Sequence, residues 1–550
     1  MRFSYQLSPD LSPLAWVAQV SFPSATATIR VTHGRFVETH PHFFVEGTWA
    51  GDFEKGRIQD SDTVFGSGGC LTDGSATFVS CTATTDFLYH NEDIGQFCIS
   101  NSLPLLLATL DDELQTSCED YSHINMSILD GIRKYRTDIP TCKGHVTRAM
   151  HGNLQIGAAG IKRVDKPFPP GFQQFEEYRE FMRNRIGALF ANARHPARQK
   201  PMHVFSTQSK GYDSTAVNAL AAPYGIDKVF TSPQSKERRS FYLGKALAQP
   251  SDDGTPICET LGLECIRIDR LRFREKLDRE QYYWAGLDNN SDLNLHHIHA
   301  YVTQPTLLLT GNLGEIWYTS KAIGKARLPT FNDELIRWDQ AGHGLGEVRL
   351  SSGIVQVAVP FIGARNRKDI LNITDSVSMN PYRLGGGYDR PIPRRIAEEA
   401  GVPRDLFGQV KLASIVHLPT PNIPVTPALR AEFLHHLVAH HLLGRLGIGL
   451  VPLAQRFNNW VYWKKPNRIF SDRDRHPWLW SISYGWSKLT GHPIRFRMRL
   501  TRLDSFLYAF CVNKVRNEYA KLLADPQTAG DTACSGTSAP LPFPQRRMKH

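Results

Sequence analysis

The sequence lacks any run of about 18 or more apolar residues, so no segment of it is expected to cross a membrane as a helix. The apolar core of a secretory signal is also missing after Met1, which makes a cytoplasmic location the expectation. None of the nine cysteines forms a C-x-x-C pair. A zinc ribbon and a disulfide framework are therefore not expected, and the cysteines are predicted to be buried, reduced thiols.

The composition is that of a folded protein with room for two or three domains. The 550 residues are 41% hydrophobic and 21% charged, which is typical of a globular chain rather than a disordered one. The formal net charge is +11. A net positive charge of this size attracts nucleic acid, an anionic membrane surface or a phosphorylated substrate.

The pattern of apolar residues divides the chain into four parts. Residues 1–165 carry short alternating runs broken by Gly, Asp and Ser, which predict strands joined by tight turns. The run 162–170 is charged and rich in proline, and is interpreted as a linker. Residues 171–424 alternate apolar strands with helical stretches, which predicts an α/β domain with a parallel sheet and helices on both of its faces. Residues 425–524 are predicted to be mainly helical, and 525–550 to be a disordered tail.

A segment with the features of a phosphate-binding loop follows the first strand of the α/β part. The strand 202–206 leads into Ser209-Lys210-Gly211-Tyr212-Asp213-Ser214, and a helix is expected to begin near Asp213. In an open parallel sheet, ligands bind where strands end, and a helix N-terminus attracts anions. Ser209 and Ser214 could donate to phosphate oxygens, and Asp213 could hold the Mg²⁺ that accompanies a nucleotide. The spacing is not that of a Walker loop.

This loop resembles the S-G-G-x-D-S pyrophosphate loop of the N-type ATP pyrophosphatases, with Lys210 in place of the first glycine. A second segment, residues 310–318, resembles the G-x-G-x-D-E segment of the asparagine synthetase-like family. Aligned on Gly311, the family's metal-binding Asp falls at Glu315, and the following Glu becomes Ile316. The resemblance implies ATP and Mg²⁺ as cofactors, with Asp213 and Glu315 as metal ligands.

Further stretches agree with the same family. Residues 229–231, which include Phe230, lie where the family places the strand beside adenine, and residues 389–411 resemble the stretch that supplies a catalytic lysine, here Lys411. The resemblance implies the following ATP-binding residues: Val204, Phe205, Ser206, Ser209, Lys210, Gly211, Tyr212, Asp213, Ser214, Phe230 and Gly311.

Residues 45–53 and 64–69 resemble the glutaminase-like (Ntn-type) β-sandwich that precedes the synthetase domain in asparagine synthetases. That domain uses an N-terminal cysteine, whereas Arg2 and Ser4 stand here and the first cysteine, Cys70, is expected in a Gly-rich turn. Glutaminase activity is therefore not expected. The fold predicted is α/β: a sandwich region, then a parallel-sheet ATP pyrophosphatase (HUP-like) synthetase domain, then a helical C-terminal extension.

The resemblance implies an ATP-dependent ligase that adenylates a carboxylate and joins it to ammonia or to a substrate amine, as in β-lactam synthetases or lasso-peptide cyclases. A tRNA-modifying ATP pyrophosphatase and a degenerate nucleotide-binding homologue remain alternatives. Residues 461–516 hold twelve Lys or Arg against three Asp, together with several Trp. This basic, Trp-rich segment suits a helical core with a solvated face, an anionic membrane surface or single-stranded nucleic acid. Nucleic acid has the least weight of these.

Overall fold

The computed structural model describes most of the chain. The described residues are 1–21, 28–72, 74–91, 96–157, 160–233, 238–239, 246–247, 251–269, 277–286, 290–321, 335, 342, 345–385, 388–410, 423–451, 453, 485–486, 489–490 and 501–524. The predicted disordered tail and the cluster of arginines between 495 and 499 lie outside these residues.

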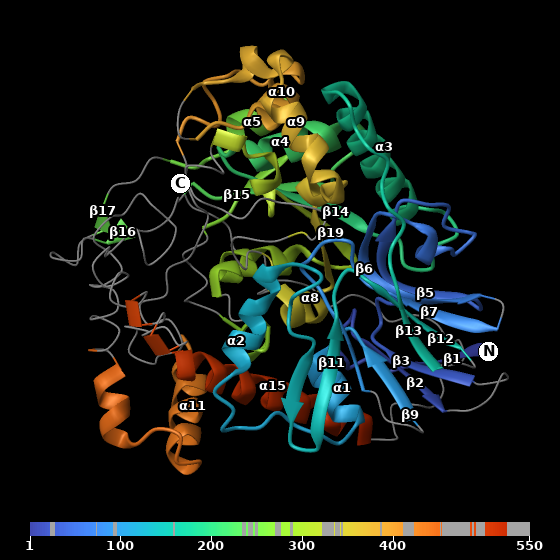
Figure 1. Ribbon diagram of the computed structural model, residues 1–550, viewed down its shortest axis with the longest axis vertical. Helices are drawn as coiled ribbons and strands as arrows, with labels where there is room; N and C mark the ends of the chain where they lie inside the picture. Colours follow the sequence, from blue (N-terminus) through green and yellow to red (C-terminus); the bar gives the residue numbers. More distant parts are fainter. Residues whose placement is uncertain are drawn as a thin grey trace, which may run out of the picture.

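The N-terminal part consists of two sheets (Figure 1). The first contains, in spatial order, β1 (Arg2–Leu7), β3 (Thr28–His33), β2 (Trp16–Ser21), β9 (Gln96–Ser100), β8 (Leu88–His90), β11 (Gly144–Ala149) and β10 (Asp138–Thr141). The second contains β13 (Gly160–Val164), β12 (Asn153–Gly157), β7 (Ser75–Val79), β6 (Val64–Thr72), β5 (Phe43–Trp49) and β4 (Glu38–Thr39). Neighbouring strands are antiparallel except β1 and β3, which pair in parallel.

Alternating apolar residues of both sheets form the core between them. Trp16 from the first sheet lies 4.9 Å, ring centre to ring centre, from Phe44 of the second, and Phe78 stacks on Trp16 at 6.0 Å. All three are fully buried. Apolar residues alternate with polar ones in these strands because every second side chain points into this shared core.

Two local predictions in this part are wrong. Cys70 lies inside strand β6 rather than in a turn, because the glycines before it let β6 lie close against β5; a Cβ at Gly66 would be 2.1 Å from the Glu46 carbonyl oxygen. The supposed linker 162–170 begins as the end of β13, which pairs with β12. Residues 165–170 have no regular structure, as a linker predicts, but Lys166 among them is buried.

The second part is built on an all-parallel sheet of five strands. Their spatial order is β18 (Cys265–Arg267), β15 (Lys228–Thr231), β14 (His203–Gln208), β19 (Thr306–Thr310) and β20 (Ile354–Ala358). Helix α4 (Tyr212–Ala221) contributes to the core on one face, together with Val204 and Leu307. On the other face, Phe205 and Leu308 pack with Ile298 of the 3-10 helix η5 (Asn290–Tyr301). The predicted parallel sheet is thus confirmed, with a 3-10 helix covering part of one face.

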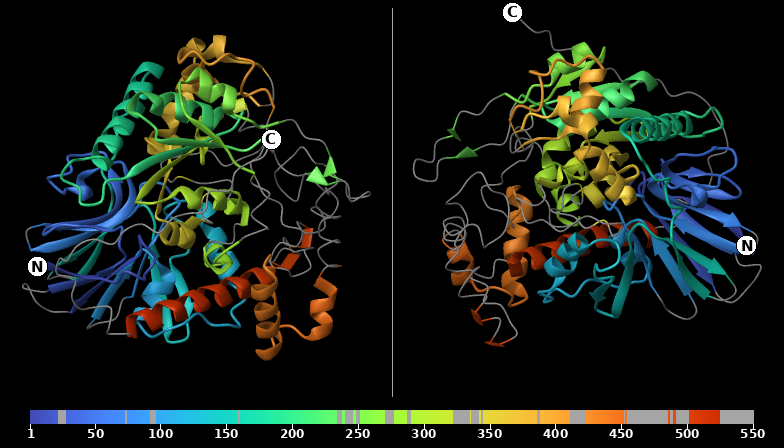
Figure 2. Two further views of the ribbon diagram at one scale, coloured as in Figure 1. Left: turned by 180° about the vertical axis from the view of Figure 1, so that it is seen from behind. Right: turned by 45° about the horizontal axis from the view of Figure 1, so that its top comes forward.

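Helices near the C-terminus join the two parts. The long helix α15 (Thr501–Ala524) packs against α1 (Leu103–Thr109) and α2 (Tyr121–Met126) of the N-terminal part, and against α6 (Glu280–Trp284) and α11 (Pro427–Ala439). Figure 2 shows α15 in red along the edge of the molecule. The Tyr519 hydroxyl of α15 donates to the Glu347 carboxylate of α8 (Gly346–Ser352) at 2.7 Å. The described residues contain no helix that is both long enough and apolar enough to pass through a bilayer.

Candidate functional site

The loop between β14 and α4 lies at the carboxyl end of the central strand of the parallel sheet. Its two serines bond to each other: the hydroxyl oxygens of Ser209 and Ser214 are 2.9 Å apart, and the Ser209 amide donates to the Ser214 hydroxyl. The Gly211 amide in turn donates to the Ser209 hydroxyl at 3.2 Å. These bonds close the loop into a compact ring ahead of the first turn of α4, whose N–H groups carry partial positive charge.

Lys210 is held in the loop through its backbone, and its side chain is half-buried. Its amide donates to Asp252 at 2.8 Å, and its carbonyl accepts from the Gly408 amide at 2.8 Å. The position that departs from the family pattern is therefore fixed on both sides. The conformation of this loop does not require a glycine here.

The second motif segment lies directly against the first. A Cβ at Gly311 would be 2.8 Å from both the Asp213 Cβ and the Ser214 amide nitrogen, and a Cβ at Gly314 would be 2.2 Å from the Asp213 Cγ. Any side chain at these two glycines would collide with Asp213. The structure thus brings the 209–214 and 310–318 segments together at the ends of the neighbouring strands β14 and β19.

Asp213 is ion-paired with Arg390, which precedes helix α10 (Pro391–Glu399). Arg390 is nearly fully buried, and its guanidinium also donates to the Gly314 carbonyl at 3.1 Å. Burial acts to lower the pKa of Arg390, but the nearby Asp213 carboxylate outweighs it and raises that pKa well above its ordinary value. The two motif segments and α10 therefore meet at one buried cation.

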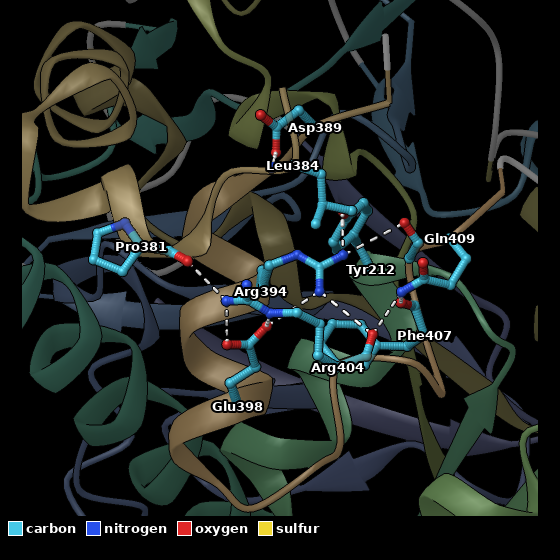
Figure 3. Close-up of polar contacts among 10 residues, drawn as sticks. Tyr212, Pro381, Leu384, Asp389, Arg394, Glu398, Arg404, Phe407 and Gln409 are labelled. Carbon is cyan, nitrogen blue, oxygen red and sulfur yellow. Dashed lines mark hydrogen bonds and ion pairs between the residues drawn. The ribbon is translucent and has the colours of Figure 1, made fainter. Parts of the chain in front are cut away.

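Helix α10 is anchored to the start of α4 by Arg394 (Figure 3). Its buried guanidinium donates to the Tyr212 hydroxyl at 2.6 Å and to the Glu398 carboxylate at 3.1 Å, and it lies over the Tyr212 ring at 4.9 Å. Phe407 packs edge-on against that ring. The Tyr212 side chain thus connects α4, α10 and the 404–409 segment through its contacts. Only the backbone of Tyr212 remains available to a ligand.

The acidic residues fit a metal ion that arrives with phosphates better than a resident ion. Within the described ranges, no three His, Cys, Asp or Glu side chains form a group that could hold a metal. Mg²⁺, however, is usually bound by one or two carboxylates together with substrate phosphates and water. The Asp213 carboxylate lies beside the loop, where it is ion-paired with Arg390. Glu315, half-buried in η6 (Gly314–Trp317), acts electrostatically on Arg367.

The remaining predicted site residues have different surroundings. Val204, Phe205 and Ser206 are buried within β14, and Phe230 of β15 packs against Phe205 with ring centres 5.5 Å apart. Val204 faces α4, whereas Phe205 and Phe230 face the opposite side of the sheet. Lys411 lies outside the described residues, as do the side chains of 288–293.

Sequence reasoning missed Arg390 and Arg394 as individual site residues. Both were inside a stretch that resembles the family, but only Lys411 in it was given a role. Arg390 directly precedes α10 and Arg394 lies in its first turns, so both arginines stand at the end of the helix that faces the loop. Arg390 reaches a residue 177 positions away, so its partner could not be read from local spacing.

Cys70 does not have the surroundings of a nucleophile. Its thiol donates to the Gln59 side chain at 2.8 Å, and burial raises the pKa of Cys70 to about 12. A thiol with such a pKa stays protonated at neutral pH, whereas nucleophilic attack requires the thiolate.

No model of a known protein family matches the chain, and no curated protein matches it in sequence.

Proposed function

We propose that this protein is an asparagine synthetase-like ligase that uses ATP to adenylate a carboxylate and then forms an amide bond, releasing AMP and pyrophosphate. The observation that carries the proposal is the packing of the 310–314 segment against Asp213 at the ends of strands β14 and β19. Two motifs that resemble one family, about a hundred residues apart in sequence, thereby meet at the edge of a parallel sheet where ligands bind.

The finer fold assignments belong to the same proposal. The five-stranded parallel sheet, with the loop of residues 209–214 (the serine loop), supports an N-type ATP pyrophosphatase domain. The two stacked N-terminal sheets support a glutaminase-like sandwich. The buried, protonated Cys70 supports a sandwich without glutaminase activity. Free ammonia or a substrate amine would then supply the nitrogen.

In this mechanism the loop and the start of α4 hold the β- and γ-phosphates, because backbone N–H groups and the helix dipole favour anions there. The substrate carboxylate attacks the α-phosphorus and pyrophosphate leaves; an amine then attacks the acyl carbon and AMP leaves. Asp213 would hold Mg²⁺ together with the phosphates, and the ion would neutralise part of their charge. Arg390 keeps the Asp213 carboxylate oriented towards Gly314 before nucleotide arrives. Lys411 is proposed to stabilise the charge on the departing group.

Pyrophosphate exchange tests the proposal. Protein incubated with Mg²⁺, ATP, labelled pyrophosphate and a panel of carboxylates, including amino acids, uronic acids and peptides, should move label into ATP with one class of carboxylate. Asp213→Asn should lower the exchange rate by on the order of 10²-fold or more, because it removes a carboxylate beside the phosphates. Asp111→Asn is the matched control, since Asp111 is exposed and pairs with Arg516 and Lys143, away from the parallel sheet. Equal loss in both variants would remove the assignment of Asp213.

A further inference from the structure

Two cysteines meet where helix α5 (Thr255–Thr260) packs against strand β18. Cys258 is fully buried in α5, and Cys265 is half-buried at the start of β18. Both are free thiols, and their side chains share a hydrogen bond. Neither cysteine has a role in the adenylation reaction proposed above.

The register of the helix and the strand accounts for this contact. Thr255 and Cys258 are three positions apart and share one face of the helix, whereas Cys265 and Arg267 are two positions apart and share one face of the strand. The two elements run in opposite directions. Arg267 Nε donates to the Thr255 hydroxyl at 3.0 Å at one end, and the thiols meet at the other. The turn between them is tight, because the Leu263 amide donates to the Cys258 carbonyl at 2.9 Å.

The surroundings of Cys265 favour its thiolate. The hydrogen bond from Cys258 lowers the pKa of Cys265. The Thr255 hydroxyl and the Arg267 charge act in the same direction, against burial and the charge of Asp253. The same hydrogen bond raises the pKa of Cys258, so the buried sulfur keeps its proton. A partly exposed cysteine of this kind, with a second thiol in contact, is typical of cysteines that react with peroxide.

We propose that Cys258 and Cys265 form a reversible disulfide when the protein meets hydrogen peroxide. The Cys265 thiolate attacks one peroxide oxygen and the O–O bond breaks. The sulfur becomes a sulfenic acid, and the other oxygen leaves as hydroxide and takes up the proton that Cys265 released. The Cys258 sulfur then attacks the sulfenic sulfur, the S–S bond forms, and the S–O bond breaks. This second hydroxide takes up the Cys258 proton, so two thiols are oxidised and one peroxide is reduced to two waters.

The disulfide would act on the segment that holds the serine loop. Helix α5 begins shortly after Asp252, whose carboxylate accepts from the Lys210 amide at 2.8 Å. The Gly254 amide donates to the Thr231 hydroxyl at 2.8 Å, and a Cβ at Gly254 would lie 2.4 Å from the Gln208 side chain. The start of α5 therefore contacts the ends of β14 and β15, while its thiol contacts β18.

The order of the strands gives the direction of the movement. Strand β18 is at the edge of the sheet, and β15 separates it from β14. A disulfide brings the two sulfurs to about 2.05 Å, whereas a hydrogen bond with the proton between them keeps them farther apart. Closing this gap draws α5 towards β18 and away from β14. The hydrogen bond between Asp252 and the Lys210 amide should then weaken, which loosens the serine loop.

Peptide mapping tests the inference without ATP and without any ligase activity. The full-length protein is treated with a small excess of hydrogen peroxide, its remaining thiols are blocked with N-ethylmaleimide, and it is cleaved at glutamate without reduction. Glu259 and Glu264 lie between the two cysteines, so only a disulfide holds their peptides together. The linked pair should form at least roughly tenfold faster than oxidised Cys142, an exposed thiol whose pKa is raised. Oxidation of Cys142 ahead of the pair, or a pair that stays unlinked, would overturn the proposal.

Variants separate the disulfide from general oxidation. In Cys258→Ser the serine hydroxyl can still donate to Cys265. Cys265 should therefore still react with peroxide and stop as a sulfenic acid that dimedone traps, with no linked peptide. Cys142→Ser is the matched control and should form the linked pair as the native protein does. A Cys265 that is inert in folded Cys258→Ser would overturn its assignment as the attacking sulfur, and the mapping of the native protein decides the question even if a variant does not fold.

Hydrogen exchange measures the effect on the serine loop. In peptides that contain Lys210, backbone amides should exchange severalfold faster after peroxide treatment and return to the original rate after dithiothreitol. The same treatment should leave exchange unchanged in Cys258→Ser. Unchanged exchange at Lys210 in native protein that contains the linked pair would overturn the coupling of the two cysteines to the loop.

Discussion

Arg390 is ion-paired with Asp213, the acidic residue of the serine loop, and also donates to the carbonyl of Gly314. One buried guanidinium thus bridges the two segments that resemble the nucleotide-binding motifs of a single family. Because the carboxylate proposed for Mg²⁺ is already balanced by a cation, Mg²⁺ must compete with Arg390 for it. Mutation of Arg390 should therefore change the Mg²⁺ concentration that the reaction requires.

Removal of the competing cation should make Mg²⁺ bind more readily. In Arg390→Gln, the Mg²⁺ concentration that gives half-maximal pyrophosphate exchange should fall severalfold, which corresponds to on the order of 1 kcal/mol. Arg395→Gln is the control on the same helix, because Arg395 pairs with Glu176 and Glu399 and not with Asp213. An Mg²⁺ dependence that is identical in both variants would contradict the proposed competition.

A methyl group at Gly314 should displace Asp213. The added Cβ in Gly314→Ala would lie 2.5 Å from both carboxylate oxygens, so the loop or the side chain must move. Exchange should fall by on the order of 10²-fold, since misplacement of a catalytic group by about 1 Å costs that much. Gly346→Ala, where a Cβ meets nothing within 4 Å, should leave exchange unchanged. Full activity in Gly314→Ala would mean that Asp213 has no role.

Loss of the Arg394 anchor should loosen the start of α4. Arg394→Met replaces the buried guanidinium group by an uncharged side chain and leaves the Tyr212 hydroxyl and the Glu398 carboxylate without this donor. We expect a loss of about 1–3 kcal/mol in stability and a rise in KM for ATP. Thermal unfolding and exchange at varied ATP measure the two effects, with Arg404→Met as the more exposed control that also contacts Glu398. An unchanged KM would separate the anchor from nucleotide binding.

Glu347 should make stability depend on pH. Burial raises its pKa to about 7 from 4.5, against the opposing hydrogen bonds from Tyr519 and Ser102. The folded state therefore binds the proton more tightly than the unfolded state, and its stability falls as pH rises from about 4.5 through 7. Over that window the contribution amounts to on the order of 2–3 kcal/mol. Glu347→Gln should abolish this fall, and its unfolding temperature relative to the native protein should rise towards pH 8.

Comparison of Glu347→Gln with Glu518→Gln isolates the effect. Glu518 accepts from Gln281 and Tyr282 at the same junction with α15. The glutamine at 347 can still bond to the two hydroxyls, because hydroxyl oxygens accept from an amide. Parallel pH profiles for the native protein and Glu347→Gln would rule out Glu347 as the titrating group.

Local sequence pattern predicted the elements that carry the loop. Strand β15 occupies 228–231 as expected, and the helix after the loop begins at Tyr212, next to the predicted start. Apolar runs that end in Ser or Gly are enough to locate these elements. The spacing of apolar residues within each element, and the residues at its two ends, determine whether it is a strand or a helix. Gly66, Gly68 and Gly69 suggested a turn around Cys70, but these glycines allow strand β6 to pack closely against β5.

Contacts between distant segments could not be predicted in the same way. Arg390 lies 177 residues from Asp213, and Lys166 is buried by residues from both halves of the chain. A charged, proline-rich run normally indicates exposure to solvent. No feature of the sequence 162–170 itself indicates that Lys166 is buried. Burial of a cation depends on the tertiary fold, and so does its pKa.

The fate of a carboxylate oxygen tests the central claim most directly. A substrate that supports exchange is prepared with ¹⁸O in its carboxylate and allowed to turn over with ATP, Mg²⁺ and ammonia or the acceptor amine. Attack on the α-phosphorus predicts AMP that carries one ¹⁸O, together with unlabelled pyrophosphate. Appearance of ¹⁸O in inorganic phosphate, with ADP as the nucleotide product, would show attack on the γ-phosphorus and contradict the account.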